Sequence, residues 1–101
     1  MNLTAYTPNQ LEYVEQLSAM FITPRDIAIM MEIDPAIVIR SLKEENSPLY
    51  TAFYKGMLQK EIEINEKYPI VDELLSENRE AIMRQLREYK ARILIQLHNG
   101  S

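Results

Sequence analysis

The side chains of this chain that could do chemistry are cations and carboxylates. The 101 residues include no cysteine and one histidine, His98, so neither a thiolate site nor a histidine cluster can form. Glu61, Glu63 and Glu66 stand among lysines in a polar stretch, which is typical of a solvated helix face rather than of an acid/base pair. The sequence also has no glycine-rich phosphate loop. It therefore predicts a non-enzymatic protein without a cofactor or a metal.

Charge is distributed unevenly along the chain. Residues 1–78 carry a net charge of −7 and residues 79–101 a net charge of +3, within a total of −4. A basic end can meet an acidic partner such as nucleic acid, or it can steer subunits together head to tail. The alternative is a solvated helix with dispersed charges, since most exposed ion pairs contribute little.

Helices are expected to position these side chains, because two glycines are too few for the turns of an all-β domain. Four of the five prolines follow a residue that can cap a helix, and proline is favoured at the first helical position. The fifth, Pro69, is more typical of the end or kink of a helix. The sequence predicts helices over about Pro8–Met20, Pro24–Met31, Pro35–Glu44, Pro48–Lys67 and from beyond Pro69 to Leu97.

The segment ITPRDIAIMMEIDPAIVIRSLKEE has a residue pattern typical of a helix-turn-helix. Two short helices are separated by the tight connection Glu32-Ile33-Asp34, which has no glycine. Small Ala28 lets the second helix approach the first closely, and Ile33 plugs the turn. Chance helical hairpins use the same residue types, so the pattern favours the motif without being unique to it.

The last predicted helix carries an apolar seam that recurs at steps of three and four residues. This spacing resembles a coiled coil of barely two heptads, and a subunit of this size can hardly cover the seam by itself. We therefore expect an all-α fold with a helix-turn-helix bundle over residues 1–47. Residues 48–101 are expected to form long helices, as an oligomerising coiled coil or a helical hairpin. The predicted oligomer interface consists of Ile82, Leu86, Tyr89, Ile93 and Leu97.

The residues after the motif, SPLYTAFYKGMLQKE, add a family resemblance. Tyr50, Phe53 and Tyr54 crowd one helical turn, where such aromatics usually fill a core, although they could also stack on bases. Gly56 follows them. Together with PRDIAIMMEIDPAIVIRSL, this stretch resembles the N-terminal region of phage small terminase subunits, over about 45 of the 101 residues. The resemblance implies a non-catalytic multimer that recognises double-stranded viral DNA and passes it to a packaging motor subunit.

If the resemblance holds, residues 35–44 form the recognition helix, and Arg25 is placed to meet a phosphate. Arg40 could donate two hydrogen bonds to a guanine edge. The predicted DNA-binding residues are Arg25, Arg40 and Lys43, and the side chains expected to point outward from the recognition helix are Ala36, Ile39, Arg40 and Lys43.

Local charge argues that one subunit binds DNA weakly. Residues 21–47 carry a net charge of −2, whereas DNA affinity depends largely on neutralising phosphates. Binding then requires either several linked subunits or help from the basic last helix. The cations of that helix are Arg79, Arg84, Arg87, Lys90 and Arg92.

A second function fits the acidic surroundings of the motif. In this interpretation the hairpin is only structural, and the chain is a helical protein–protein interaction module that binds no DNA. For either function we expect a cytoplasmic protein, because the sequence has no cysteine, residues 1–7 lack the features of a signal peptide, and no apolar run is long enough for a membrane span.

Overall fold

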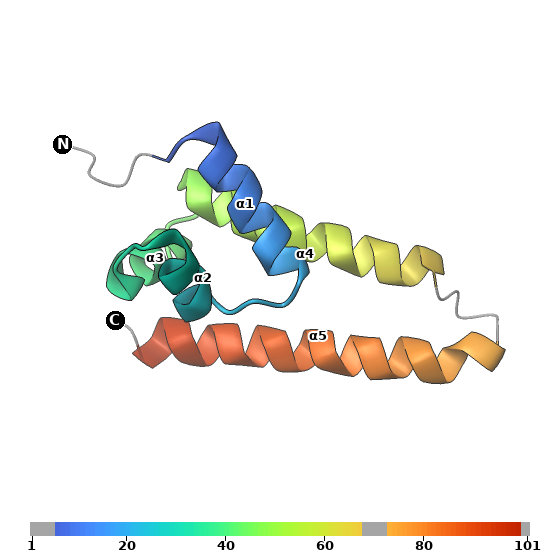
Figure 1. The fold of residues 1–101 in the computed structure, drawn as a ribbon. Helices are drawn as coiled ribbons and strands as arrows, with labels where there is room; N and C mark the ends of the chain where they lie inside the picture. Colours follow the sequence, from blue (N-terminus) through green and yellow to red (C-terminus); the bar gives the residue numbers. More distant parts are fainter. Residues whose placement is uncertain (1–5, 68–72, 100–101) are drawn as a thin grey trace.

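The computed structural model describes residues 6–67 and 73–99, and within these ranges all regular secondary structure is helical. This confirms the predicted all-α fold. Figure 1 shows α5 running along one side of the molecule, with α4 beside it, α1 crossing α4, and the short α2 and α3 at one end. The helices are α1 (Pro8–Ala19), α2 (Pro24–Met31), α3 (Pro35–Leu42), α4 (Pro48–Lys67) and α5 (Glu73–Asn99).

The four predicted capping residues start the first four helices. The Thr7 hydroxyl accepts the Gln10 N–H at 3.1 Å, and the Gln10 side chain accepts the Thr7 N–H in return, which completes a capping box. Proline costs nothing at these starts, because its missing N–H would lack a helical partner there. The break predicted at Pro69 lies outside the described residues. The other caps are Thr23 on Asp26, Asp34 on Ala36, and Ser47 on Leu49.

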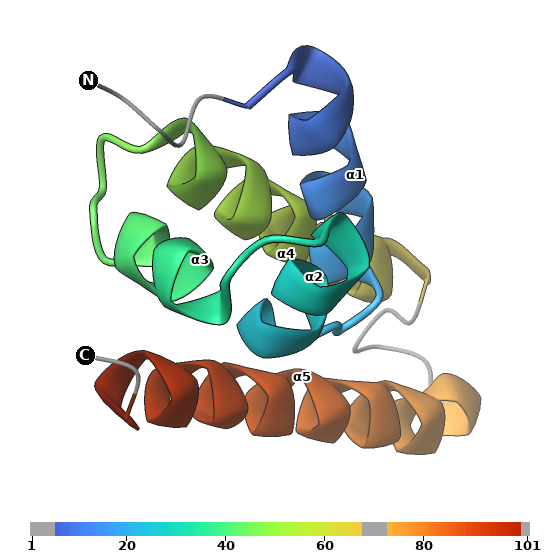
Figure 2. The same cartoon turned by 60° about the vertical axis from the view of Figure 1, so that its left-hand side comes forward.

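One hydrophobic core joins all five helices. The sequence-predicted apolar positions of α1 and α4 largely point into it, and Phe53 lies near its centre with 1% of its surface exposed. The boundary proposed at residue 47 therefore divides the chain in sequence but not in packing. Figure 2 shows α5 lying across α2 and α3 on the side away from α1. The buried core residues are Val14, Leu17, Ile27, Ala28, Val38, Leu42, Leu49, Ala52, Phe53, Met57, Leu86, Tyr89 and Ile93.

The crossing of α1 and α4 depends on Gly56. A Cβ atom at this position would lie 2.1 Å from both the Glu15 carbonyl oxygen and the Ser18 Oγ. The Ser18 hydroxyl is itself fixed, because it donates a hydrogen bond to the Glu15 carbonyl at 3.0 Å. The glycine that contributes to the family resemblance thus has a packing role here: it lets the two helix backbones touch.

Candidate nucleic-acid interface

The α2–turn–α3 unit has the closed geometry that its sequence predicts. The N–H of Ile33 donates to the Ala28 carbonyl at 2.9 Å, and the N–H of Glu32 donates to the Ile29 carbonyl at 3.1 Å. These two bonds end α2 in a Schellman turn. Glu32 has φ 58° and ψ 41°, a left-handed conformation that glycine adopts more readily. The turn therefore keeps its shape without a glycine, at the cost of strain in Glu32.

On α3 the structure separates two groups of side chains. Ala36, Arg40 and Lys43 are exposed, as the sequence predicts. Ile39 was expected to point outward with them, and this is wrong, because only 4% of its surface is exposed. Ile39 lies three residues before buried Leu42, so both fall on the inward side of the helix. The outward surface of α3 is therefore smaller and more polar than predicted.

The structure brings together two of the three predicted DNA-binding cations. Arg40 lies in the last turn of α3, and Lys43 follows as its C-terminal cap. Arg25 lies on another element, at the start of α2, where its backbone N–H donates to the Gln96 side chain of α5 at 3.0 Å. Its own side chain is exposed. Arg25 is thus placed relative to α5, whereas Arg40 and Lys43 share one end of α3.

Acidic residues are frequent in the sequence around these cations but do not pair with them. Among the described residues, no side-chain hydrogen bond or ion pair involves Arg25, Arg40 or Lys43. The cations therefore keep their full capacity to donate to an added anion, although the local net charge over residues 21–47 remains −2. The nearby acids in sequence are Asp26, Glu32, Asp34, Glu44 and Glu45.

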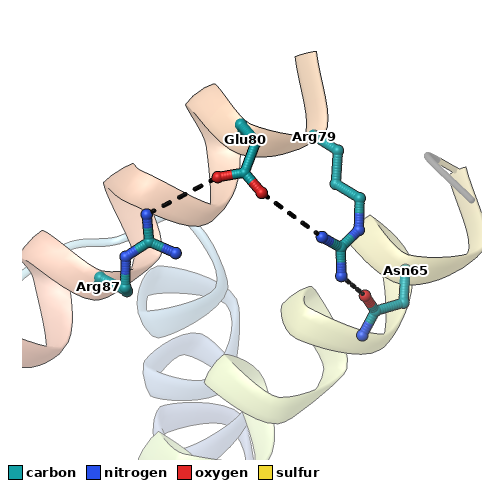
Figure 3. Close-up of polar contacts among 4 residues, drawn as sticks. All are labelled: Asn65, Arg79, Glu80 and Arg87. Atoms are coloured by element: carbon teal, nitrogen blue, oxygen red, sulfur yellow. Dashed lines mark hydrogen bonds and ion pairs between the residues drawn. The ribbon is translucent and has the colours of Figure 1, made fainter. Parts of the chain in front are cut away.

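Three of the five cations of the last helix, by contrast, contact carboxylates of their own chain. Figure 3 shows the Glu80 carboxylate between Arg79 and Arg87. One guanidinium nitrogen of each arginine lies 4.0 Å from a Glu80 carboxylate oxygen. Arg79 also donates a hydrogen bond to the Asn65 side-chain oxygen of α4 at 2.9 Å. Lys90 forms an ion pair with Glu61 at 2.9 Å. Of the five cations proposed to assist DNA binding, Arg84 and Arg92 alone have no such contact within the described chain. Arg84 and Arg92 are therefore the cations of α5 best placed to give the expected help.

The apolar seam of α5 packs into the same chain. Leu86, Tyr89 and Ile93 are at most 2% exposed, and Ile82 and Leu97 are half-buried. This corrects the interface predicted on the seam for its three central residues, because those side chains already belong to the core of one subunit. The other four helices provide enough apolar surface to cover the centre of the α5 seam. The prediction from the sequence assumed that so short a chain could not do this.

Tyr89 has a role that the sequence did not indicate. Its hydroxyl donates a hydrogen bond to the carbonyl of Ile22, in the turn between α1 and α2. Its ring contacts that of Phe21, with 5.3 Å between the ring centroids. Burial, with a smaller contribution from Tyr54, raises the pKa of Tyr89 well above its usual range. Tyr89 therefore fixes the turn before α2 to α5. The periodicity of α5 showed only that this residue lies on the apolar face.

The described chain shows no arrangement typical of a metal site or a membrane span. Within residues 6–67 and 73–99, no three His, Asp or Glu side chains converge as metal ligands would. None of the helices described combines the length and apolarity needed to cross a membrane. Of the three α4 carboxylates considered at the start, Glu61 pairs with Lys90 and Glu63 lies 3.6 Å from Lys60, as solvated helix faces commonly show.

No protein-family model matches this chain, and comparison with curated proteins and with solved structures finds no significant match.

Proposed function

We propose that this protein is a DNA-associated helix-turn-helix protein that contacts the phosphate backbone through Arg40 and Lys43. One observation carries the proposal: the α2–turn–α3 unit is closed, and both cations at the end of α3 are exposed and unpaired within the described chain. Arg25 adds a third exposed cation at the start of α2. Cations in this position fit phosphate oxygens, which provide most protein–DNA hydrogen bonds.

The position of Arg40 favours phosphate contact over base recognition. Recognition helices read base edges mainly with their N-terminal residues, and Arg40 lies in the last turn of α3. The N-terminal outward residue, Ala36, offers only a methyl group. We therefore expect weak binding with little sequence preference for each subunit, strengthened when several subunits act together. Delivery of viral DNA to a packaging motor, as in small terminase subunits, rests on the resemblance of residues 23–56.

The test is binding of the full chain to fluorescently labelled duplex DNA, measured by anisotropy as salt is raised from a low concentration. Arg40→Ala/Lys43→Ala is expected to weaken binding and to reduce the slope of log K against log salt by about 2, one unit for each lost phosphate contact. A matched control is Arg79→Ala/Arg87→Ala, which removes the same charge from α5 at the two arginines that contact Glu80. If both double variants lost the same affinity for DNA, the wild type would bind by nonspecific charge attraction instead of through Arg40 and Lys43.

A second function is favoured by a different observation, the apolar outer face of α2. Ile29 is 66% exposed and Met30 is 55% exposed, on the helix that would cross the DNA backbone. Apolar side chains gain nothing beside phosphates, whereas they are typical of a surface that binds protein. In this case the chain is a protein–protein interaction module. Ile29→Ser/Met30→Ser then abolishes partner binding, while Arg40→Ala/Lys43→Ala has no effect on it.

A further inference from the structure

An exposed apolar strip runs along the outer face of α4. Leu58 and Ile62 are 55% and 56% exposed, and they lie four residues apart on the same side of the helix. The half-buried rings of Tyr50 and Tyr54 continue the strip toward the start of α4, with 4.5 Å between their centroids. Two hollows, of about 350 and 450 Å³, meet at Tyr54 and Leu58. Both hollows are open to solvent.

Charges follow one edge of this strip in a definite order. Lys55 lies toward the start of α4. Its side chain is 59% exposed and its Nζ lies 3.9 Å from a Glu15 carboxylate oxygen, a long and exposed pair of the kind that contributes little. Exposed Glu66 lies toward the end of α4. At 1.5 Å per residue they are about 17 Å apart along the axis, and their positions on the helical wheel differ by about 20°. Leu58 and Ile62 lie between them. The edge is therefore cationic at one end and acidic at the other.

We propose that this strip binds a second copy of the chain, with the two α4 helices packed antiparallel about a two-fold axis near residue 60. Such an axis lies in the interface, so the charged edge of one helix meets the same edge of its copy in the reverse direction. Leu58 then lies level with Ile62 of the copy, and Lys55 lies within about 2 Å, along the axis, of Glu66 of the copy. The surface is complementary to itself only in this orientation.

The charge order disfavours the competing parallel arrangement. A parallel two-fold pair would place the charged edge of each helix against the opposite edge of its copy, where α5 contributes Leu94 and Lys90, which is already paired with Glu61. Lys55 of one copy and Glu66 of the other would then lie on opposite sides of the interface and could not meet. Antiparallel pairing forms two Lys55–Glu66 contacts and buries Leu58 and Ile62 twice, by symmetry. The cationic and acidic ends thus select the copy and its direction.

This pairing does not rest on DNA binding, but it would give the proposed function two helix-turn-helix units in one assembly. The strip involves neither α2 nor α3, so Arg40 and Lys43 stay available in each copy. Failure of the two proposals is therefore distinguishable: chain mass reports the pairing, and anisotropy on DNA reports the contact at α3.

Sedimentation equilibrium of the full chain provides the test, with circular dichroism to show that each variant is folded. The wild type is expected to have twice the mass of the chain. Leu58→Glu introduces two charges into the apolar contact and should weaken pairing by about 100-fold or more. The control Ile95→Glu changes a similarly exposed apolar residue on α5, 58% against 55% for Leu58, and should pair like the wild type.

Charge exchange tests the direction of the pairing even if Leu58→Glu disturbs folding. Lys55→Glu alone and Glu66→Lys alone each produce like charges at both contacts, so each should pair about tenfold more weakly. Mixing the two variants restores opposite charges at both contacts and should yield the mixed dimer. A monomeric wild type, pairing that Leu58→Glu leaves intact, or variants that do not recover on mixing would each overturn the proposal.

Discussion

The two turns that flank α2 have the same backbone geometry but different surroundings. Phe21 and Glu32 are the two non-glycine residues with positive φ in the described chain, at 64° and 58°. Each turn is closed by the same pair of hydrogen bonds back into the preceding helix. The ring of Phe21 packs against Tyr89, whereas Glu32 is exposed. Strain at Phe21 is offset by packing, and strain at Glu32 has no such compensation.

The largest expected effect comes from Gly56→Ala, which acts on α1 just before the first turn. The added methyl group would press on Glu15 and Ser18 in the last part of α1, and the Ser18 carbonyl accepts the Phe21 N–H at 3.1 Å. We expect a loss of about 3 kcal/mol in the free energy of unfolding, typical of severe overpacking. Urea denaturation measures it, with Gln59→Ala on the exposed side of α4 as the control. A loss below about 1 kcal/mol would show that the crossing yields easily.

Phe21→Gly should destabilise the protein although it relieves the strained backbone. The lost ring packing is worth more than the relieved strain, so we expect a net loss of about 2 kcal/mol. Phe21→Ala loses the ring and keeps the strain, and should be about 1 kcal/mol worse than Phe21→Gly. Thermal and urea denaturation of both variants separate the two terms. If the alanine variant were the more stable, strain at this turn would be negligible.

Tyr89→Phe should remove the bond from α5 to the first turn while keeping the ring contact. The Ile22 carbonyl loses its side-chain donor, so we expect a loss of about 1 to 2 kcal/mol near neutral pH. The matched control is Tyr13→Phe, a half-buried tyrosine on α1. Equal stability of Tyr89→Phe and wild type would show that the bond contributes little.

The same pair of proteins gives a pH test. Burial raises the pKa of Tyr89 in the folded state, so above pH 10 the unfolded chain loses the Tyr89 proton while the folded chain keeps it. Stability provided by the neutral hydroxyl is thus complete below pH 10 and is lost as pH rises further. The advantage of wild type over Tyr89→Phe should narrow by about 1 kcal/mol per pH unit above 10, measured by urea denaturation. A stability difference between wild type and Tyr89→Phe that stays constant above pH 10 would contradict this prediction.

The smallest effect, of opposite sign, is expected at the second turn. Glu32→Gly relieves the left-handed strain with no packing to lose, so we expect a gain of about 0.5 to 1 kcal/mol after the added entropy of the unfolded chain. Glu32→Ala should match the wild type. Glu44→Gly, where φ is not positive, should lose stability slightly. Destabilisation by Glu32→Gly would mean that the Glu32 side chain contributes a contact of its own.

Local signals in the sequence predicted the helices well, because capping and proline act within a few residues. The starts at Pro8, Pro24, Pro35 and Pro48 follow from Thr, Asp and Ser caps that the structure shows in place. The spacing of apolar residues also showed that α5 has one apolar face. The spacing of apolar residues cannot show which surface covers them. The seam of α5 was therefore assigned to a partner subunit, whereas the same chain covers its three central residues.

The candidate site was predictable only where it depends on helical position. Exposure of Arg40 and Lys43 followed from their spacing on α3, but burial of Ile39 depends on how α3 is rotated against the core. The contacts of Glu80 with Arg79 and Arg87 are local to α5 and follow from their spacing in the sequence. The pair of Lys90 with Glu61 was not visible, because these residues are 29 positions apart. Long-range pairs of this kind need the tertiary structure.

The contact of Tyr89 and Gln96 with the start of α2 has a consequence for how the chain is made. The ribosome releases α5 after the other four helices, so the first turn waits for its hydroxyl donor and its aromatic neighbour until most of the described chain has emerged. Until Tyr89 has emerged, the Phe21 ring lacks this aromatic neighbour, and chaperones and proteases can reach it. The hydrogen bond and the ring contact that fix the turn before α2 therefore form late in synthesis, and a chain that ends before Tyr89 lacks both.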